Sequence, residues 1–116
     1  MKEIIVDGVI YVPKENKAQE KDGMKYCIIR TYSAGVFAGY LESRNGKEVK
    51  IRDARRLWYW EGACSLSQLA KEGTKKPEKC KFAVPVDSIL VLEAIEIIET
   101  TAEAQKSIME VPEWKI

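Results

Sequence analysis

The sequence contains no histidine, and this absence restricts the chemistry that the protein can perform. Ser-His-Asp and Cys-His nucleophile systems both need an imidazole, and histidine is the commonest zinc ligand. Histidine is also the usual general base near neutral pH. Carboxylate pairs or lysine can replace it, but no such arrangement stands out. We therefore expect a protein that is not an enzyme and that holds no metal or cofactor.

Cysteines and long apolar runs are also scarce. The three cysteines, Cys27, Cys64 and Cys80, are widely spaced and form no CxxC pair, which suits reduced, partly buried thiols with a structural role. No apolar run approaches the length of a membrane span. The start "MKEIIVDGVIYV" lacks the basic head, long apolar stretch and cleavage site of a signal peptide. We expect a cytoplasmic protein.

The charge is nearly balanced over the whole chain, at +1, but unevenly distributed. Residues 44–56 carry six basic residues against two acidic ones, a net charge of +4. Residues 82–116 carry two lysines against seven acidic residues, a net charge of −5. Proteins that coat long nucleic acids usually show a clear basic excess. The pattern favours a small anionic ligand, or two segments that attract each other within or between subunits.

The first 23 residues differ from the rest. "EIIVDGVIYVP" predicts a short hairpin with Asp7-Gly8 at the turn, and "KENKAQEKDG" is polar and has no apolar periodicity. We therefore divide the chain into an extension with its linker, 1–23, and a main domain, 24–116.

The main domain begins with strand patterns. "KYCIIRTY" alternates between two faces, "SAG" predicts a turn, and "VFAGYLES" predicts the returning strand. "RNGKEVKI" follows, and Asn45-Gly46 suits a type I′ hairpin turn. If "ARRLWYWEG" is extended, Arg56, Trp58 and Trp60 share one face, and Arg55, Leu57 and Tyr59 share the other.

Two short helices complete the pattern. "SLSQLAKEG" predicts a helix with a capping box of Ser65 and Gln68 and a stop at Gly73. "CKFAVPV" and "SILVLEAIEII" are strand-like, and "TTAEAQKSIMEV" predicts a closing helix capped by Thr100 and Glu103. The predicted fold class is α+β, with a mainly antiparallel sheet.

The stretch "RRLWYWEGA" gives the main candidate binding site. Aromatic faces stack on bases, and arginine binds phosphate through paired hydrogen bonds. The alternative is that Trp58, Tyr59 and Trp60 pack in the core or on the sheet, with Arg55 and Arg56 paired to the acidic C-terminal segment.

Two further features favour an anion. Arg30 ends a strand beside Ser33, Ala34 and Gly35, whose backbone amides could form an anion-binding nest, or which could be an ordinary hairpin turn. A helix begins at Ser65, and helix N-terminal amides favour anions. The alternating Glu93, Glu96 and Glu99 are best explained as a solvated sheet face. Trp114 is expected to pack on this subunit or on a neighbour.

Several blocks together resemble a family of small phage proteins. "YCIIRTYSAGVFAGYLE", "RDARRLWYWEGACSLSQLA", "CKFAVPV" and "SIMEVPEWKI" are similar to the first family of Thoeris anti-defence proteins. The resemblance spans roughly residues 24–116. It implies a non-catalytic sponge that sequesters cyclic ADP-ribose isomers made by TIR-domain immune enzymes. Some members of that family are hexamers that also bind cyclic di- or trinucleotides in separate pockets, so the resemblance implies a homo-oligomer, either a dimer or a hexamer.

The chemistry of the residues suggests how such a ligand would be held. We expect the phosphates to contact Arg30, Arg55 and Arg56. We expect the stacking surfaces or pocket walls to come from Phe37, Trp58 and Trp60. Ser33, Ala34, Gly35 and the helix start at Ser65 would offer backbone amides to the ligand.

Two other functions are compatible with the sequence. The aromatic strand could be the interface of a small phage protein that blocks a host protein, since Trp, Tyr and Arg are enriched in interfaces. A nucleic-acid binder would instead show a steep fall of affinity with salt. We expect no membrane partner and no long nucleic acid.

Overall fold

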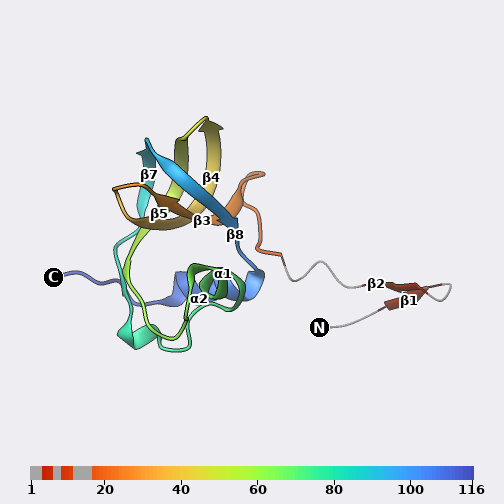
Figure 1. The fold of residues 1–116 in the computed structure, drawn as a ribbon. Coiled ribbons are helices and arrows are strands. Elements are labelled where there is room, and N and C mark those ends of the chain that lie inside the picture. Colours follow the sequence, from red (N-terminus) through yellow and green to blue (C-terminus); the bar gives the residue numbers. More distant parts are fainter. Residues whose placement is uncertain (1–3, 7–8, 12–16) are drawn as a thin grey trace.

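A computed structural model describes residues 4–6, 9–11 and 17–116. Within this part of the chain, a six-stranded antiparallel sheet lies above two short helices (Figure 1). The predicted α+β fold class is confirmed. No helix of the described residues is long and apolar enough to cross a membrane.

The elements follow the predicted order, with some differences in length. The strands and helices are β1 (Ile4–Val6), β2 (Val9–Tyr11), β3 (Lys25–Thr31), β4 (Val36–Asn45), β5 (Glu48–Tyr59), α1 (Leu66–Glu72), a 3₁₀ turn (Pro77–Lys79), β6 (Lys81–Phe82), β7 (Val86–Val91), β8 (Ala94–Glu99) and α2 (Ala102–Glu110). β5 is a single strand across two predicted segments, and "SILVLEAIEII" is divided between β7 and β8.

The sheet curls towards a closed barrel. The order of the strands is β6-β5-β4-β3-β8. β7 pairs with β5 on the same side as β6 does. β7 and β8 therefore lie at opposite edges, although only Leu92 and Glu93 separate them in the chain. Two backbone hydrogen bonds fix this junction, from Tyr32 N–H to the Glu93 carbonyl at 2.9 Å and from Ala94 N–H to the Lys47 carbonyl at 2.9 Å. The two edges consequently meet at this end of the sheet.

The N-terminal segment contacts the domain before Met24. β1 and β2 pair in antiparallel register, as predicted, while the predicted Asp7-Gly8 turn lies outside the described residues. Gln105 binds Gln19 twice, since its Oε1 accepts from the Gln19 N–H at 2.8 Å and its Nε2 donates to the Gln19 carbonyl at 3.0 Å. Lys21 forms an ion pair with Asp53 at 2.8 Å. Contacts with the domain thus begin within the predicted linker.

Turns and caps follow the predicted chemistry, with small shifts. Asn45 pairs with Glu48, so the turn residues are Gly46 and Lys47 rather than Asn45 and Gly46. Gly46 alone has a positive φ, 63°, which fits a type II′ turn rather than the predicted type I′. The cap of α2 is Thr101, whose hydroxyl accepts from the Ala104 N–H at 3.1 Å; the predicted cap, Thr100, is buried and donates to the Tyr26 carbonyl.

The cap of α1 agrees with the prediction. The hydroxyl of Ser65 accepts from the Gln68 N–H at 3.1 Å, and the helix ends at Gly73, where φ is 75°. The Gln68 side chain returns to the N–H of Cys64 at 2.7 Å, one residue before the predicted partner.

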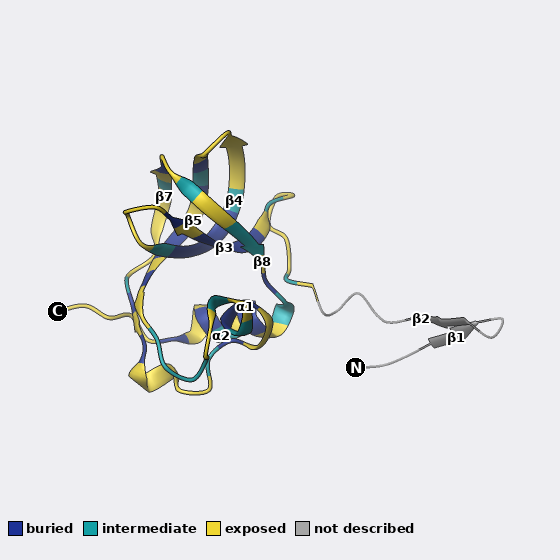
Figure 2. Cartoon of the chain, viewed as in Figure 1, coloured by how far each residue is buried: buried dark blue, intermediate teal, exposed yellow. Residues whose placement is uncertain are grey.

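Strand β3 is buried on both faces. Tyr26 and Ile28 of β3 join the layer that faces the helices, and Cys27 and Ile29 join the layer inside the curled sheet. Figure 2 shows these buried residues in dark blue along β3, with further ones on the helices. Apolar residues on both faces explain why four consecutive residues of β3 are buried.

A bulge in β5 changes which face each residue occupies. Asp53 has a φ of 50°, and the register with β4 shifts between the pairs Tyr40–Arg52 and Ala38–Arg55. Gly39 lies opposite, where an added Cβ would stand 2.8 Å from the Arg52 carbonyl oxygen. The absence of a side chain at Gly39 gives the bulged strand room.

Candidate functional site

A groove of about 570 Å³ lies between the β3–β4 turn and the C-terminal half of β5. Six of the ten predicted site residues line it, together with two that sequence reasoning missed. The predicted residues are Ser33, Ala34, Gly35, Arg56, Trp58 and Trp60, and the additional ones are Val36 and Leu57. The groove forms because Phe37 of β4 pairs with Arg56 of β5, which places the turn beside the aromatic segment.

Arg56 supplies the positive charge of the groove. Its guanidinium lies over the Phe37 ring, 4.8 Å from the ring centroid, and this contact holds the charged group flat against the sheet. Within the described part of the chain, Arg56 forms no ion pair and no side-chain hydrogen bond. Its N–H donors are therefore available to an anion in the groove.

The β3–β4 turn offers fewer amides than predicted. Thr31 organises the turn, since its hydroxyl donates to the Gly35 carbonyl at 2.7 Å and accepts from the Ala34 N–H at 2.9 Å. The Ala34 amide is thus already used. Gly35 has a φ of 100°, and an added Cβ would meet no atom within 4 Å, so the turn leaves open space beside the groove.

Tryptophans provide the apolar surface. Trp58 is 64% exposed, while Trp60 is partly buried and packs against the helix-facing core. The ring of Trp114, which was expected to pack on this subunit or on a neighbour, lies parallel to that of Trp58 and is 49% exposed. An exposed tryptophan beside an available arginine is the combination that binds a base and its phosphate.

Arg55 does not belong to the groove, which corrects its prediction as a phosphate ligand. It is 3% exposed and donates to four backbone carbonyls, at 2.8 Å to Ala83, 2.7 Å to Ile108, 3.3 Å to Phe82 and 2.5 Å to Val111. Burial lowers the pKa of its guanidinium. Arg55 instead ties the end of α2 and the segment after β6 to the sheet.

Three other predicted residues also lie outside the groove. Arg30 is exposed and pairs with Glu96 of β8 at 2.9 Å. Phe37 is fully buried, so its ring supports Arg56 and offers no face to a ligand. Ser65 caps a helix of only seven residues, and its hydroxyl is occupied by the Gln68 N–H.

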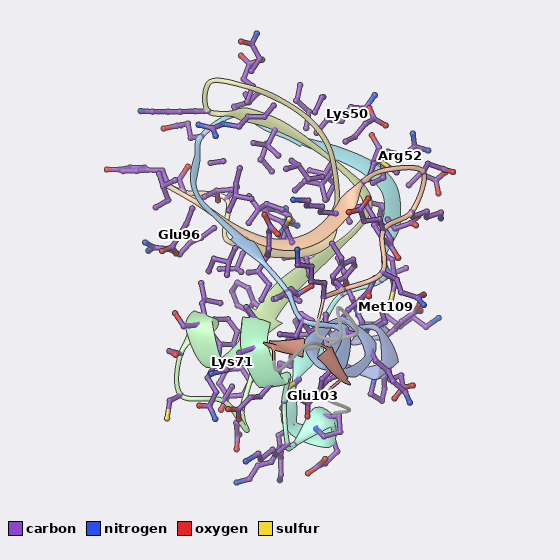
Figure 3. The ribbon with its side chains drawn as sticks, turned by 90° about the vertical axis from the view of Figure 1, so that its right-hand side faces the viewer. Lys50, Arg52, Lys71, Glu96, Glu103 and Met109 are labelled. Atoms are coloured by element: carbon purple, nitrogen blue, oxygen red, sulfur yellow. The ribbon has the colours of Figure 1, made fainter. Side chains whose placement is uncertain are left out.

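The basic residues before the bulge have partners of their own. Lys50 and Arg52 both pair with Glu42, at 3.2 Å and 2.9 Å, and Figure 3 shows their side chains close together on the sheet. Arg44 donates to the Gly46 carbonyl at 2.9 Å. Lys50 and Arg52 thus form ion pairs with Glu42 of the neighbouring strand β4, and Arg52 also donates to the Asp87 carbonyl of β7 at 3.1 Å.

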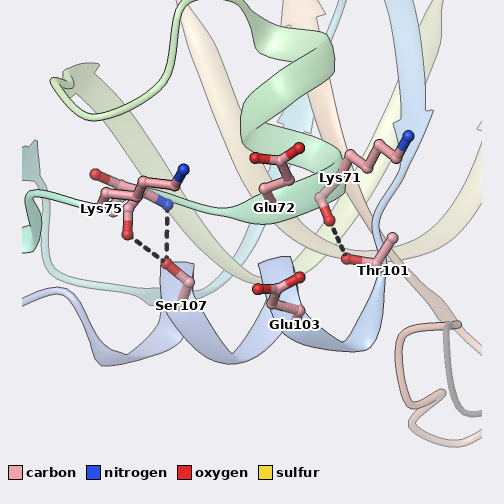
Figure 4. Close-up of a pocket in the computed structure, with 7 residues that line it drawn as sticks. Lys71, Glu72, Lys75, Thr101, Glu103 and Ser107 are labelled. Carbon is pink, nitrogen blue, oxygen red and sulfur yellow. Dashed lines mark hydrogen bonds between the residues drawn. The ribbon is translucent and has the colours of Figure 1, made fainter. Parts of the chain in front are cut away.

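A second hollow, of about 700 Å³, lies between α1 and α2. Figure 4 shows its polar lining, in which Thr101 donates to the Lys71 carbonyl and Ser107 accepts from the Thr74 N–H. Lys71 and Lys75 stand against Glu72 and Glu103, so its charges balance. With hydroxyls engaged and no net charge, this hollow favours an anionic ligand less than the groove does.

The cysteines form no disulfide. Cys27 and Cys80 are buried, and burial raises the pKa of the Cys27 thiol to about 11. Cys64 is exposed, which differs from the partly buried position expected for all three. Among the described residues, no group of three or more Cys, Asp or Glu side chains could hold a metal ion.

Comparisons with known proteins identify the family of the domain and give no activity for it. No curated protein and no solved structure gave a significant match. One family model matches residues 24–108, which include β3 to β8 and most of α2. The chain therefore belongs to the family described as a domain of unknown function, DUF6948.

Proposed function

We propose that this protein is a phage counter-defence sponge that binds cyclic ADP-ribose isomers and sequesters them without degrading them. The observation that carries the proposal is Arg56, an available guanidinium in a groove that Trp58 and Trp60 also line. The resemblance to Thoeris anti-defence proteins supplies the ligand class. On this proposal the protein acts in the cytoplasm of the infected bacterium as a homo-oligomer, and cyclic di- or trinucleotides are further candidate ligands.

The groove fits the chemistry of such a ligand. A cyclic ADP-ribose isomer combines a pyrophosphate with adenine, so it needs a cation and an aromatic face within one site. Arg56 would contact the pyrophosphate through charge-assisted hydrogen bonds, and Trp58 would stack on the base. The open turn at Gly35 leaves room for the ribose groups.

Calorimetry with a cyclic ADP-ribose isomer tests the proposal. We expect saturable binding, and intact ligand after heat denaturation and chromatography. Arg56→Ala should weaken binding about 10- to 150-fold, because a hydrogen bond to a charged group contributes about 1.5–3 kcal/mol. Arg44→Ala is the matched control, since it removes the same charge outside the groove and should bind as the parent does. Absence of binding, or recovery of a cleaved ligand, would reject the sponge.

A second candidate is a protein-interaction module that blocks a host protein. Four large apolar side chains on β7, β8 and the junction between them are exposed, namely Val86, Leu90, Leu92 and Ile95. Exposed apolar patches often mark interaction sites. A host protein that co-purifies with the parent but not with a Leu90→Glu, Leu92→Glu variant would favour this function.

A further inference from the structure

The segment after α2 is fixed beside the groove. The Trp114 N–H donates to the Phe82 carbonyl at 2.8 Å, and Glu113 forms a parallel bridge with Phe82 of β6. Arg55 holds the same segment from beneath through the carbonyl of Val111. Backbone contacts to β6 and a buried arginine therefore set the position of the Trp114 side chain.

The rings of Trp58 and Trp114 are parallel but only slightly overlapped. Their centroids are 6.4 Å apart and their planes differ by 4°. Offset aromatic pairs have centroids about 4.5–7 Å apart, so this pair lies near the wide end of the range. Trp58 is 64% exposed and Trp114 is 49% exposed. Both indoles thus keep about half or more of their surface exposed to solvent.

A cation lies beside this pair. The Lys81 ammonium is 5.6 Å from the centroid of the Trp114 ring and 5.9 Å from that of Tyr59. Trp58 lines the groove and its ring also stacks with that of Trp114, so the aromatic pair begins at the wall of the groove. Trp58 therefore connects the groove that holds Arg56 with the second indole.

We propose that Trp58 and Trp114 form a stacking platform for the purine base of a nucleotide held in the groove. This inference rests on the proposed function, in which the phosphate contacts Arg56. It adds the C-terminal segment, through Trp114, to the binding site. The occupant is a purine nucleotide, since the platform supplies flat apolar faces and both Arg56 and Lys81 supply positive charge. Trp114 would then determine specificity for ligands that carry a base.

Titrations of the full chain with AMP and with ribose 5-phosphate, followed by tryptophan fluorescence and calorimetry, test the platform. We expect AMP to bind more tightly than ribose 5-phosphate. Trp114→Ala should weaken AMP binding about 5- to 150-fold, the range for one stacked base, and leave ribose 5-phosphate unchanged. Trp114→Phe should retain most of the affinity. Leu90→Ala, which removes an exposed apolar side chain from β7, should bind AMP as the parent does.

The outcomes separate the platform from the proposed function. Equal AMP affinity of the parent and Trp114→Ala, or no preference for AMP over ribose 5-phosphate, overturns the platform. If a cyclic ADP-ribose isomer fails to bind while AMP binding still depends on Trp114, the sponge is rejected and the platform stands. If the isomer binds equally to the parent and to Trp114→Ala, the sponge stands and the platform is rejected. Urea denaturation of each variant verifies that it is folded.

Discussion

Arg55 and Arg56 are adjacent and chemically identical, yet they occupy opposite environments. Arg55 is buried and donates to four carbonyls beneath α2 and the C-terminal segment. Arg56 is exposed, lies over the Phe37 ring and lines the groove. The two arginines of one basic pair therefore take different roles, because successive side chains of a strand point to opposite faces.

The bulge at Asp53 decides which arginine receives which role. Before the bulge, the odd-numbered Val49 and Ile51 face the inside of the curled sheet, and after it the even-numbered Ala54 does so. Without the extra residue, Arg55 would continue the face of Ile51 and Arg56 would face the other way. A local change of backbone thus determines the chemistry of both surfaces.

The largest expected effect that separates the two arginines is on stability. Arg55→Met should lower the free energy of unfolding by about 3 kcal/mol or more, because each buried acceptor left without a donor costs about 1–3 kcal/mol. Arg56→Met, the matched control, should stay within about 0.5 kcal/mol of the parent, as for most surface substitutions. Urea denaturation measures both. Equal stability of the two variants would contradict the division of roles.

A smaller effect is expected at the residue opposite the bulge. Gly39→Ala places a Cβ 2.5 Å from Ile51 Cγ2 and 2.8 Å from the Arg52 carbonyl oxygen, so the bulged strand must move. We expect a loss of about 1–3 kcal/mol, typical of overpacking. Thermal or urea unfolding provides the measurement. A variant as stable as the parent would show that the bulge does not depend on this glycine.

The smallest effect concerns the cations that precede the bulge. Hydrogen bonds from Arg52 and Lys50 lower the pKa of the Glu42 carboxyl. Their contribution to stability is present above the ordinary carboxyl pKa and is lost as pH falls through the lowered one. Glu42→Gln should therefore make the free energy of unfolding depend slightly less on pH in the acid range. Its effect on stability should be smaller than that of Gly39→Ala. Unfolding curves across the acid range test this, and an unchanged pH profile would exclude the contribution.

The site illustrates how far sequence reasoning extends. Arg56, Trp58 and Trp60, which the alternation from Arg55 to Trp60 placed on one face, all line the groove, but so does Leu57, which the alternation placed on the other face. The alternation did not reveal that α2 and the C-terminal segment would cover the face of Arg55 rather than the face of Arg56. No pattern in the sequence pointed to Val36, Leu57 or Lys81 as part of the site. Trp114 was expected only to pack on this subunit or on a neighbour.

The local features of the fold follow from short stretches of the sequence. Gly46 specified a hairpin turn, Ser65 and Gly73 bounded α1, and the apolar run from Tyr26 to Ile29 specified β3, since these depend on the conformations of neighbouring residues. Three features depend instead on the folded arrangement of the whole domain: the closure at Leu92–Glu93, the burial of Arg55 and the approach of Trp114 to Trp58. Each of these depends on contacts between segments far apart in the chain, and no local sequence pattern indicates the free energies of those contacts.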